Sequence, residues 1–201
     1  MKIGTISDIH ENFHNLLLAL DKLKEEGVEE ILCLGDLMNA GIAKVLSIQD
    51  VPVFMIWGNN DGEKVDIVRT AFRENSCLTV SLNTYDFLER DNRKIFISHY
   101  DDLAVPMAQS GVYDAVFFGH NHIQSFQKIG NCVVANPGEI AASKTGKATF
   151  LMYETSDNSV VFYELEGIKT LKSDLVEAYF KDNKTQMGFR SKESFDVFFK
   201  K

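Results

Sequence analysis

The sequence predicts an α/β fold in which two sheets pack together and helices cover the outside. In the first third, short apolar segments alternate with amphipathic helical segments, which favours a parallel sheet covered by helices. The second half consists mainly of short strand-like segments joined by turns, which indicates antiparallel strands at the sheet margins. The chain has 201 residues, so it is long enough to bury a full core without disulfides or structural metals.

The first third is predicted to contain three strands, each followed by a helix. Short apolar runs predict buried strands at residues 2–7, 31–35 and 53–57. Apolar side chains between Phe13 and Leu23 recur at helical spacing, and Gly27 offers a stop signal. Helices are therefore expected over residues 13–26 and, between and after the next strands, over 40–48 and 62–74.

The segments that follow are predicted to be rich in strands. Short apolar or alternating runs predict strands at residues 78–81, 85–89, 94–98 and 114–118. A helix over 102–109 contains Pro106, so it is expected to be short or kinked. Two pairs of runs joined by polar turns predict hairpins, at 125–129 with 132–135 and at 148–154 with 160–165.

Residues 166–201 differ in character, because they contain five phenylalanines among residues of both charges. Their spacing suits two helices, one with Leu171, Leu175, Tyr179 and Phe180 and one with Phe195, Phe198 and Phe199. Each buried phenylalanine contributes roughly 1.5–3 kcal/mol, so these side chains are not expected to stay in solvent. We expect a domain over 1–165 and a helical extension over 166–201 that packs on the domain or on a partner subunit, in the second case within a homodimer.

Composition limits the compartment and the partners. Lysine and arginine total 21 against 29 aspartates and glutamates, so the net charge is −8, which does not favour long nucleic acid as a partner. The three cysteines include no CxxC pair, which fits a reducing cytoplasm better than a disulfide framework. No apolar run approaches the roughly 20 residues of a membrane span. Asp8 comes too early for a signal peptide, so a cytoplasmic location is expected.

Seven polar side chains follow or flank the ends of five predicted strands, and four of them are histidines. They are Asp8, His10, Asp36, Asn59, His99, His120 and His122. In open α/β sheets, ligands bind outside the carboxyl ends of the strands, so these side chains are expected to share one rim. Glycines at positions 35, 58 and 119 would let the backbone turn sharply beside them.

This set has the composition of a site for two metal ions. Imidazole and carboxylate groups suit Mn²⁺, Fe, Zn²⁺ or Ni²⁺, and seven ligands exceed the needs of one ion. Two ions about 3.5–4 Å apart can clamp a phosphoryl group and deprotonate a shared water.

Each motif alone also has a structural interpretation, and the alternatives carry different weight. Asp36 could cap a helix, Asn59 and Asn60 could form a turn, and a lone His99 could be a loop residue. Only their joint placement at strand ends makes these interpretations improbable. Four other features are expected to be structural or at most to border the site: His14 on the surface, Asp101 or Asp102 as a helix cap, Asn136-Pro137-Gly138 as a type II-like turn beside the site, and the cysteines with Trp57 in the core.

Together the motifs resemble the five-block signature of the calcineurin-like metallophosphoesterases, in particular the branch of small prokaryotic phosphodiesterases. The blocks are Asp8-x-His10, Gly35-Asp36, Gly58-Asn59-x-Asp61, His99 and Gly119-His120-x-His122. The resemblance covers about residues 1–165 and implies a four-layer α/β/β/α sandwich, with two mixed sheets flanked by helices. It also implies that Asp8, His10, Asp36 and His122 hold one metal ion. Asp36 would bridge to a second ion, completed by Asn59, His99 and His120.

Three positions depart from the family pattern. Many members have a histidine, proposed as the general acid, where this chain has Asn60, and a carboxamide cannot act as an acid. Tyr100 follows His99 where glycine is common, and Glu11 stands where glycine is frequent. The seven ligand positions are all retained.

The leading hypothesis is a metal-dependent hydrolase of a small phosphodiester or nucleotide-like substrate. A hydroxide bridging two divalent ions, expected to be Mn²⁺ with Ni²⁺, Fe or Zn²⁺ as alternatives, would attack phosphorus in line. Asp36 would hold the ions, and Asn59 with Asn60 would contact the substrate, where Asn59 offsets the growing negative charge. One alternative is a non-catalytic binding scaffold, because the family includes a retromer subunit of that kind. A phosphomonoesterase or nucleotide pyrophosphatase is another, since two metal ions can reverse the local field of an acidic protein.

Overall fold

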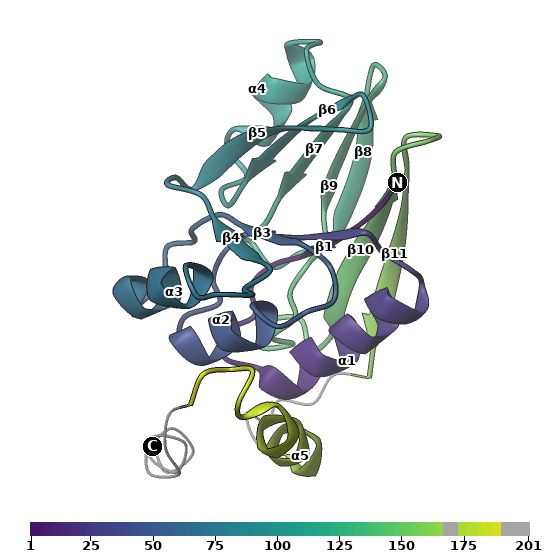
Figure 1. Ribbon diagram of the computed structural model, residues 1–201. Coiled ribbons are helices and arrows are strands. Elements are labelled where there is room, and N and C mark those ends of the chain that lie inside the picture. Colours follow the sequence, from purple (N-terminus) through teal and green to yellow (C-terminus); the bar gives the residue numbers. More distant parts are fainter. Residues whose placement is uncertain (167–172, 190–201) are drawn as a thin grey trace.

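The computed structural model describes residues 1–166 and 173–189, and within them the strands form two mixed sheets (Figure 1). The larger sheet has six strands, in the spatial order β11 (Ser159–Leu165), β10 (Ala148–Glu154), β1 (Lys2–Ile6), β2 (Glu30–Cys33), β3 (Val53–Met55) and β4 (Leu78–Val80). The first four strands of the chain pair in parallel, and β10 and β11 add antiparallel partners at the β1 side. All carboxyl ends of β1 to β4 therefore meet at one edge.

The smaller sheet also combines parallel and antiparallel strands. Its strands follow the order β5 (Tyr85–Arg90), β6 (Arg93–Ser98), β7 (Ala115–Phe118), β9 (Cys132–Asn136) and β8 (Ser125–Ile129). The three central strands β6, β7 and β9 are parallel, whereas β5 and β8 at the two margins are antiparallel. The predicted hairpin of β8 and β9 is present, and β9 also pairs in parallel with β7.

Helices cover the outer face of each sheet, so the layers are helix, sheet, sheet and helix (Figure 1). The larger sheet is covered by α1 (Phe13–Glu25), α2 (Ala40–Leu46) and α3 (Lys64–Ala71), and the smaller sheet by α4 (Ala104–Gln109). The four-layer sandwich that the sequence predicts is confirmed. Among the described residues, no helix has the length and apolar character that a membrane span needs.

The alternation of side chains along β1 shows how the layers are joined. Ile3 points into the core between the sheets, whereas Ile6 joins the core beneath the helices, and both are fully buried. Gly4 lies against α1 so closely that a Cβ would stand 2.8 Å from Leu23, so the helix can rest directly on the strand. The core between the sheets also contains Phe117 and Tyr153, whose rings meet edge to face.

Two helix starts settle alternatives that the sequence left open. Asn39 caps α2 by accepting hydrogen bonds from the N–H groups of Gly41 and Ile42, so Asp36 is not the helix cap. The cap residue of α4 is Leu103, which makes no side-chain capping bond, so the predicted capping by Asp101 or Asp102 is wrong. The Asp101 carboxylate instead accepts a hydrogen bond from Asn121.

Helix α5 (Asp174–Asn183) lies on the outer side of α1 (Figure 1). Phe180 is fully buried, and its ring meets Phe13 of α1 edge to face, with ring centres 5.2 Å apart. His14 is half-buried and its Nδ1 lies 2.7 Å from Oγ of Ser173, the cap residue of α5, so the prediction of an exposed surface histidine is wrong. The second helix predicted for the extension lies outside the described residues, as does Leu171.

The packing of α5 leads to a prediction about stability. Phe180→Ala should lower the free energy of unfolding by about 3–5 kcal/mol, because it removes a fully buried aromatic ring from the core beneath the helices. Phe72→Ala is the matched control, because Phe72 is 87% exposed and its removal should change little. Urea unfolding of both variants checks this, and equal small effects would contradict a stabilising role for α5.

Candidate metal centre

The predicted site residues follow five parallel strands, and the backbone ties these strand exits to one another. The N–H of Asp8 donates to the carbonyl of Gly35, and the N–H of His10 donates to that of Asp36. In the smaller sheet, the N–H of Gly119 donates to the carbonyl of His99. These bonds hold neighbouring exits at fixed spacing, so the side chains meet at the edge where the two sheets face each other.

Five of the seven predicted ligands have left-handed backbone conformations. The φ angles are positive at Asp8 (53°), His10 (42°), Asp36 (56°), His120 (70°) and His122 (70°). Such conformations cost on the order of 1–3 kcal/mol each for residues other than glycine, and they concentrate at functional sites. The rest of the fold holds these residues in place, and the sharp turns bring their side chains back over the strand ends.

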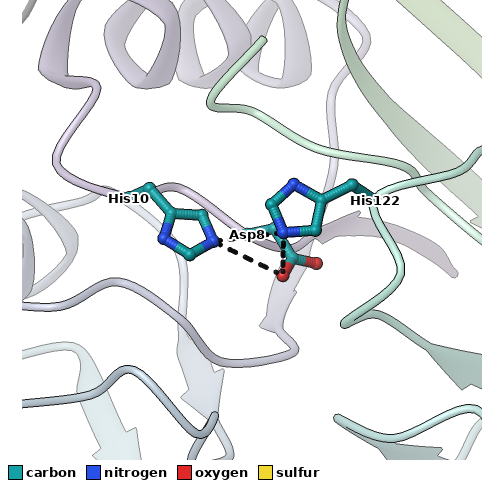
Figure 2. Close-up of side chains that lie close together, drawn as sticks. All are labelled: Asp8, His10 and His122. Atoms are coloured by element: carbon teal, nitrogen blue, oxygen red, sulfur yellow. Dashed lines mark hydrogen bonds and ion pairs between the residues drawn. The ribbon is translucent and has the colours of Figure 1, made fainter. Parts of the chain in front are cut away.

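One group of side chains contains Asp8, His10 and His122 (Figure 2). The Nε2 atoms of the two histidines are 3.3 Å apart, and the rings are stacked. Oδ1 of Asp8 lies 3.4 Å from Nε2 of His122 and 3.8 Å from Nε2 of His10. Three potential ligand atoms thus converge from the exits of β1 and β7.

Asp36 connects this group to a second one. Its Oδ2 is 3.4 Å from Nε2 of His10, and its Oδ1 is 3.7 Å from Nε2 of His99. Asp8, Asp36 and His99 form the second group, and Oδ1 of Asn59 lies 3.0 Å from Nε2 of His99. Asp36 is buried, with one carboxylate oxygen facing each side, which is the placement that a bridging ligand requires.

The hydrogen bonds of His99 and His122 indicate which ring nitrogen of each side chain carries the proton. Nδ1 of His99 lies 2.8 Å from the carbonyl oxygen of Leu34, which can only accept, so Nδ1 is the donor. Nδ1 of His122 likewise faces the Glu139 carboxylate at 2.7 Å. In the neutral rings, both Nε2 atoms therefore present lone pairs, and these face the oxygens of Asn59 and Asp8. Lone pairs directed at oxygen are repulsive unless a proton or a metal ion lies between them.

Asp8 provides a second sign that a cation fits. Its Oδ2 accepts hydrogen bonds from the Ser7 hydroxyl and the His120 N–H, but its buried Oδ1 accepts none from the described part of the chain. A buried carboxylate oxygen without a partner is costly. Burial alone would raise the pKa of Asp8, but interactions with His10, Ser7 and the other histidines outweigh burial and lower it. The residues present therefore fit divalent metal ions.

The charge balance acts on His10 in the opposite direction. Burial tends to lower its pKa, but Asp8 and Asp36 attract the protonated ring more strongly, and the pKa is raised. The carboxylates thus favour positive charge at this place, whether a proton or a metal ion supplies it.

His120 lies beside the groups rather than within them. Its ring meets His99 and Tyr100 edge to face, with ring centres 5.1 and 5.0 Å away. Neither of the two ligand groups includes its nitrogens. Its backbone N–H nevertheless holds Oδ2 of Asp8, so the residue contributes to the site through the main chain in this structure.

Asn60 and Asp61 support the bridging carboxylate. The backbone N–H and the side-chain amide of Asn60 donate to the two oxygens of Asp36, both at 2.8 Å. Asp61 accepts hydrogen bonds from the N–H groups of Asp36, Met38 and Gly58, which fastens the exit of β2 to that of β3. The loop that carries Asn60 and Asp61 therefore holds Asp36 in place.

Glycine is required at two exits for space rather than for backbone freedom. A Cβ at Gly58 would overlap the Asp36 carboxylate, and one at Gly119 would overlap the Ser7 hydroxyl. Of the three glycines expected to allow sharp turns, only Gly35 has a positive φ, of 96°. The prediction thus holds for Gly35, whereas Gly58 and Gly119 allow close approach.

The sequence interpretation missed Glu139, a fully buried carboxylate after β9 that contacts His122. It did anticipate that Asn136-Pro137-Gly138 could border the site. The amide of buried Asn136 donates to the carbonyl of Gly119 and to Asn121, while its Oδ1 accepts from the N–H of Gly138. This turn therefore supports the loop that carries His120 and His122. The signal for Glu139 was its position, a lone acid between a buried strand and the apolar Ile140-Ala141-Ala142.

The fold and the site together define a two-sheet α/β protein with a cluster of potential metal ligands where strand exits converge. A family model described as the calcineurin-like phosphoesterase superfamily domain matches residues 1–158, so the chain belongs to this superfamily, as predicted. It is 31% identical over 160 residues to phosphodiesterase MJ0936 of Methanocaldococcus jannaschii, covering 77% of this chain and 93% of the relative.

Solved structures agree with this assignment. One described as a novel archaeal phosphodiesterase has 28% sequence identity and a TM-score of 0.73, covering 82% of this chain and all of that one. Wild-type Vps29 from Entamoeba histolytica in complex with zinc has 22% identity and a TM-score of 0.57, covering 82% of this chain and 91% of that one. The second likeness shows a shared fold alone.

Proposed function

We propose that this phosphoesterase is a metal-dependent phosphodiesterase that acts on small phosphodiester or nucleotide-like substrates. The observation that carries the proposal is the set of unmatched lone pairs around Asp8, in which its buried Oδ1 faces Nε2 of His122. The similarity to phosphodiesterase MJ0936 supports the reaction class. The proposed ligands are imidazole, carboxylate and amide groups, with no cysteine among them. This mixture favours Mn²⁺, with Ni²⁺, Fe or Zn²⁺ as alternatives.

In this proposal, two ions share the cluster. The first ion would be held by Asp8, His10, Asp36 and His122, and the second by Asp36, Asn59, His99 and His120. The distances from Asp36 to His10 and to His99 support its role as the bridge. For His120 the proposal requires its ring to turn from its contacts with His99 and Tyr100.

When bound, the two ions would supply an activated water and neutralise charge on the phosphoryl oxygens. The chain's own residues then determine orientation. Asn59 is exposed, its Oδ1 faces His99, and its amide nitrogen can donate to a phosphoryl oxygen as negative charge grows. Asn60, also exposed, keeps Asp36 oriented and borders the place where the substrate would lie.

Residues 1–165 are proposed as the catalytic domain and 166–201 as an extension that stabilises it. The contact of Phe180 with Phe13 supports the packing of the extension on the domain. A homodimer remains part of the proposal, as does a cytoplasmic location, which the three cysteines without a CxxC pair favour.

The test is metal-free protein reconstituted separately with Mn²⁺, Ni²⁺, Zn²⁺ and Mg²⁺ and assayed on bis-p-nitrophenyl phosphate and p-nitrophenyl phosphate. We expect turnover of the diester, highest with Mn²⁺, and slower turnover of the monoester. Faster hydrolysis of the monoester would instead indicate a phosphomonoesterase. Metal-loaded protein that hydrolyses neither ester, nor a nucleotide pyrophosphate bond, would favour the scaffold.

A further inference from the structure

Glu139 is the most completely hydrogen-bonded carboxylate of the site, and its side chain is fully buried. Its Oε2 accepts hydrogen bonds from Nδ1 of His122 at 2.7 Å and from the N–H and hydroxyl of Ser143. Its Oε1 accepts from the N–H of Lys144 and from the N–H and hydroxyl of Thr145. One carboxylate thus joins a proposed metal ligand to the loop at 143–145.

Only an ionised carboxylate can accept from all of these donors at once. A fixed negative charge therefore lies behind His122, on the side away from Asp8.

This charge determines which nitrogen of His122 can bind a metal ion. Because Nδ1 donates to Glu139, the neutral ring keeps its lone pair on Nε2, which lies 3.4 Å from Oδ1 of Asp8 and 3.3 Å from Nε2 of His10. An acceptor behind an imidazole fixes the orientation of the ring and increases the basicity of the opposite nitrogen.

We propose that Glu139 is a positioning residue for the metal centre, which fixes the tautomer and the orientation of His122 and thereby strengthens metal binding. The proposal rests on the proposed function, because it assumes that His122 is a ligand. Loss of such an outer partner typically weakens metal binding about 10–100-fold.

Two variants separate this role from simple anchoring of the loop. Glu139→Gln keeps the size of the side chain but removes its charge, and the amide must turn a donor toward His122 or toward the loop. The double variant Ser143→Ala/Thr145→Val is the matched control, since it removes two hydroxyl donors and keeps the carboxylate contact with His122.

Titration calorimetry with Mn²⁺ measures the effect without an activity assay. We expect Glu139→Gln to bind Mn²⁺ about 10–100-fold more weakly than the unmodified protein, and the double variant to bind within about threefold of it. Unchanged affinity in folded Glu139→Gln would overturn the proposal. So would equal losses in both variants, because loop anchoring would then explain them.

Nitrogen NMR of the unmodified, metal-free protein at pH 8 gives an answer even if Glu139→Gln does not fold. The signals of His122 are assigned by their disappearance in His122→Gln, and we expect the proton on Nδ1. A proton on Nε2 would overturn the positioning role. If the unmodified protein binds no Mn²⁺, the proposed function fails and the positioning role fails with it, whereas Mn²⁺ binding with the proton on Nε2 overturns the positioning role alone.

Discussion

Asp36→Ala is expected to abolish binding of both proposed metal ions and, with it, the proposed phosphodiester hydrolysis. Each carboxylate oxygen of Asp36 faces a different histidine, His10 on one side and His99 on the other, so one substitution removes a ligand from both positions. The affinity for Mn²⁺ should fall by more than the roughly 10–100-fold that loss of a residue hydrogen-bonded to a ligand typically causes. The backbone should persist, because the carbonyl of Asp36, which accepts from Ile9 and His10, is unaffected.

Elemental analysis and Mn²⁺ calorimetry measure the outcome. The unmodified protein should bind close to two ions per chain and Asp36→Ala close to none. Asp101→Ala is the matched control, because it removes an exposed carboxylate that bonds Asn121 beside the site and should leave stoichiometry unchanged. A variant that retains one ion would show that Asp36 serves a single position and would refute the bridge.

The convergence of the site could be predicted because parallel strands present their carboxyl ends at one edge. Asp8, Asp36 and Asn59 follow three neighbouring parallel strands, β1, β2 and β3, and this relation is visible in the alternation of strands and helices. His99 and His122 follow β6 and β7 of the other sheet. Their meeting with the first group depends on how the sheets face each other, which local patterns do not specify.

The place of Glu139 in the site could not be predicted from local sequence patterns. A hairpin pattern predicts the antiparallel pairing of β8 and β9, but it contains no information that β9 also pairs in parallel with β7. That second pairing turns the end of β9 toward the same rim and makes Glu139 the neighbour of His122. Non-local pairing therefore controls which buried acid becomes part of the site.

Side-chain partners were less predictable than strand positions for the same reason. His14 lies on an amphipathic helix and gives no local sign of Ser173, which is distant in the chain and caps α5. Asp101 precedes a helix, yet its carboxylate bonds Asn121 from another strand exit. When a partner from a distant part of the chain is available, a carboxylate can bond to that partner instead of capping the helix that follows it.

Hydrolysis is expected to depend steeply on the leaving group, because Asn60 stands where the family resemblance implies a histidine as the general acid. A carboxamide cannot transfer a proton to a departing alkoxide, and here its amide already donates to Asp36. Nitrophenyl diesters, whose leaving groups need no protonation, should therefore react far faster than alkyl diesters. A plot of log kcat against leaving-group pKa over a series of aryl and alkyl diesters measures the slope.

Asn60→His should flatten this slope, since a positioned acid contributes about 10²–10⁴-fold, and the gain should be confined to the poor leaving groups. Asn60→Ala is the control, because it also removes the side-chain hydrogen bond to Asp36 but supplies no acid. If both variants slow all diesters equally, the effect comes from a misplaced Asp36 carboxylate. A flat slope in the unmodified protein would show that another group donates the proton or that a step other than bond cleavage limits the rate. Under either result Asn60 would not set the leaving-group dependence, and its contact with Asp36 would remain its role in the site.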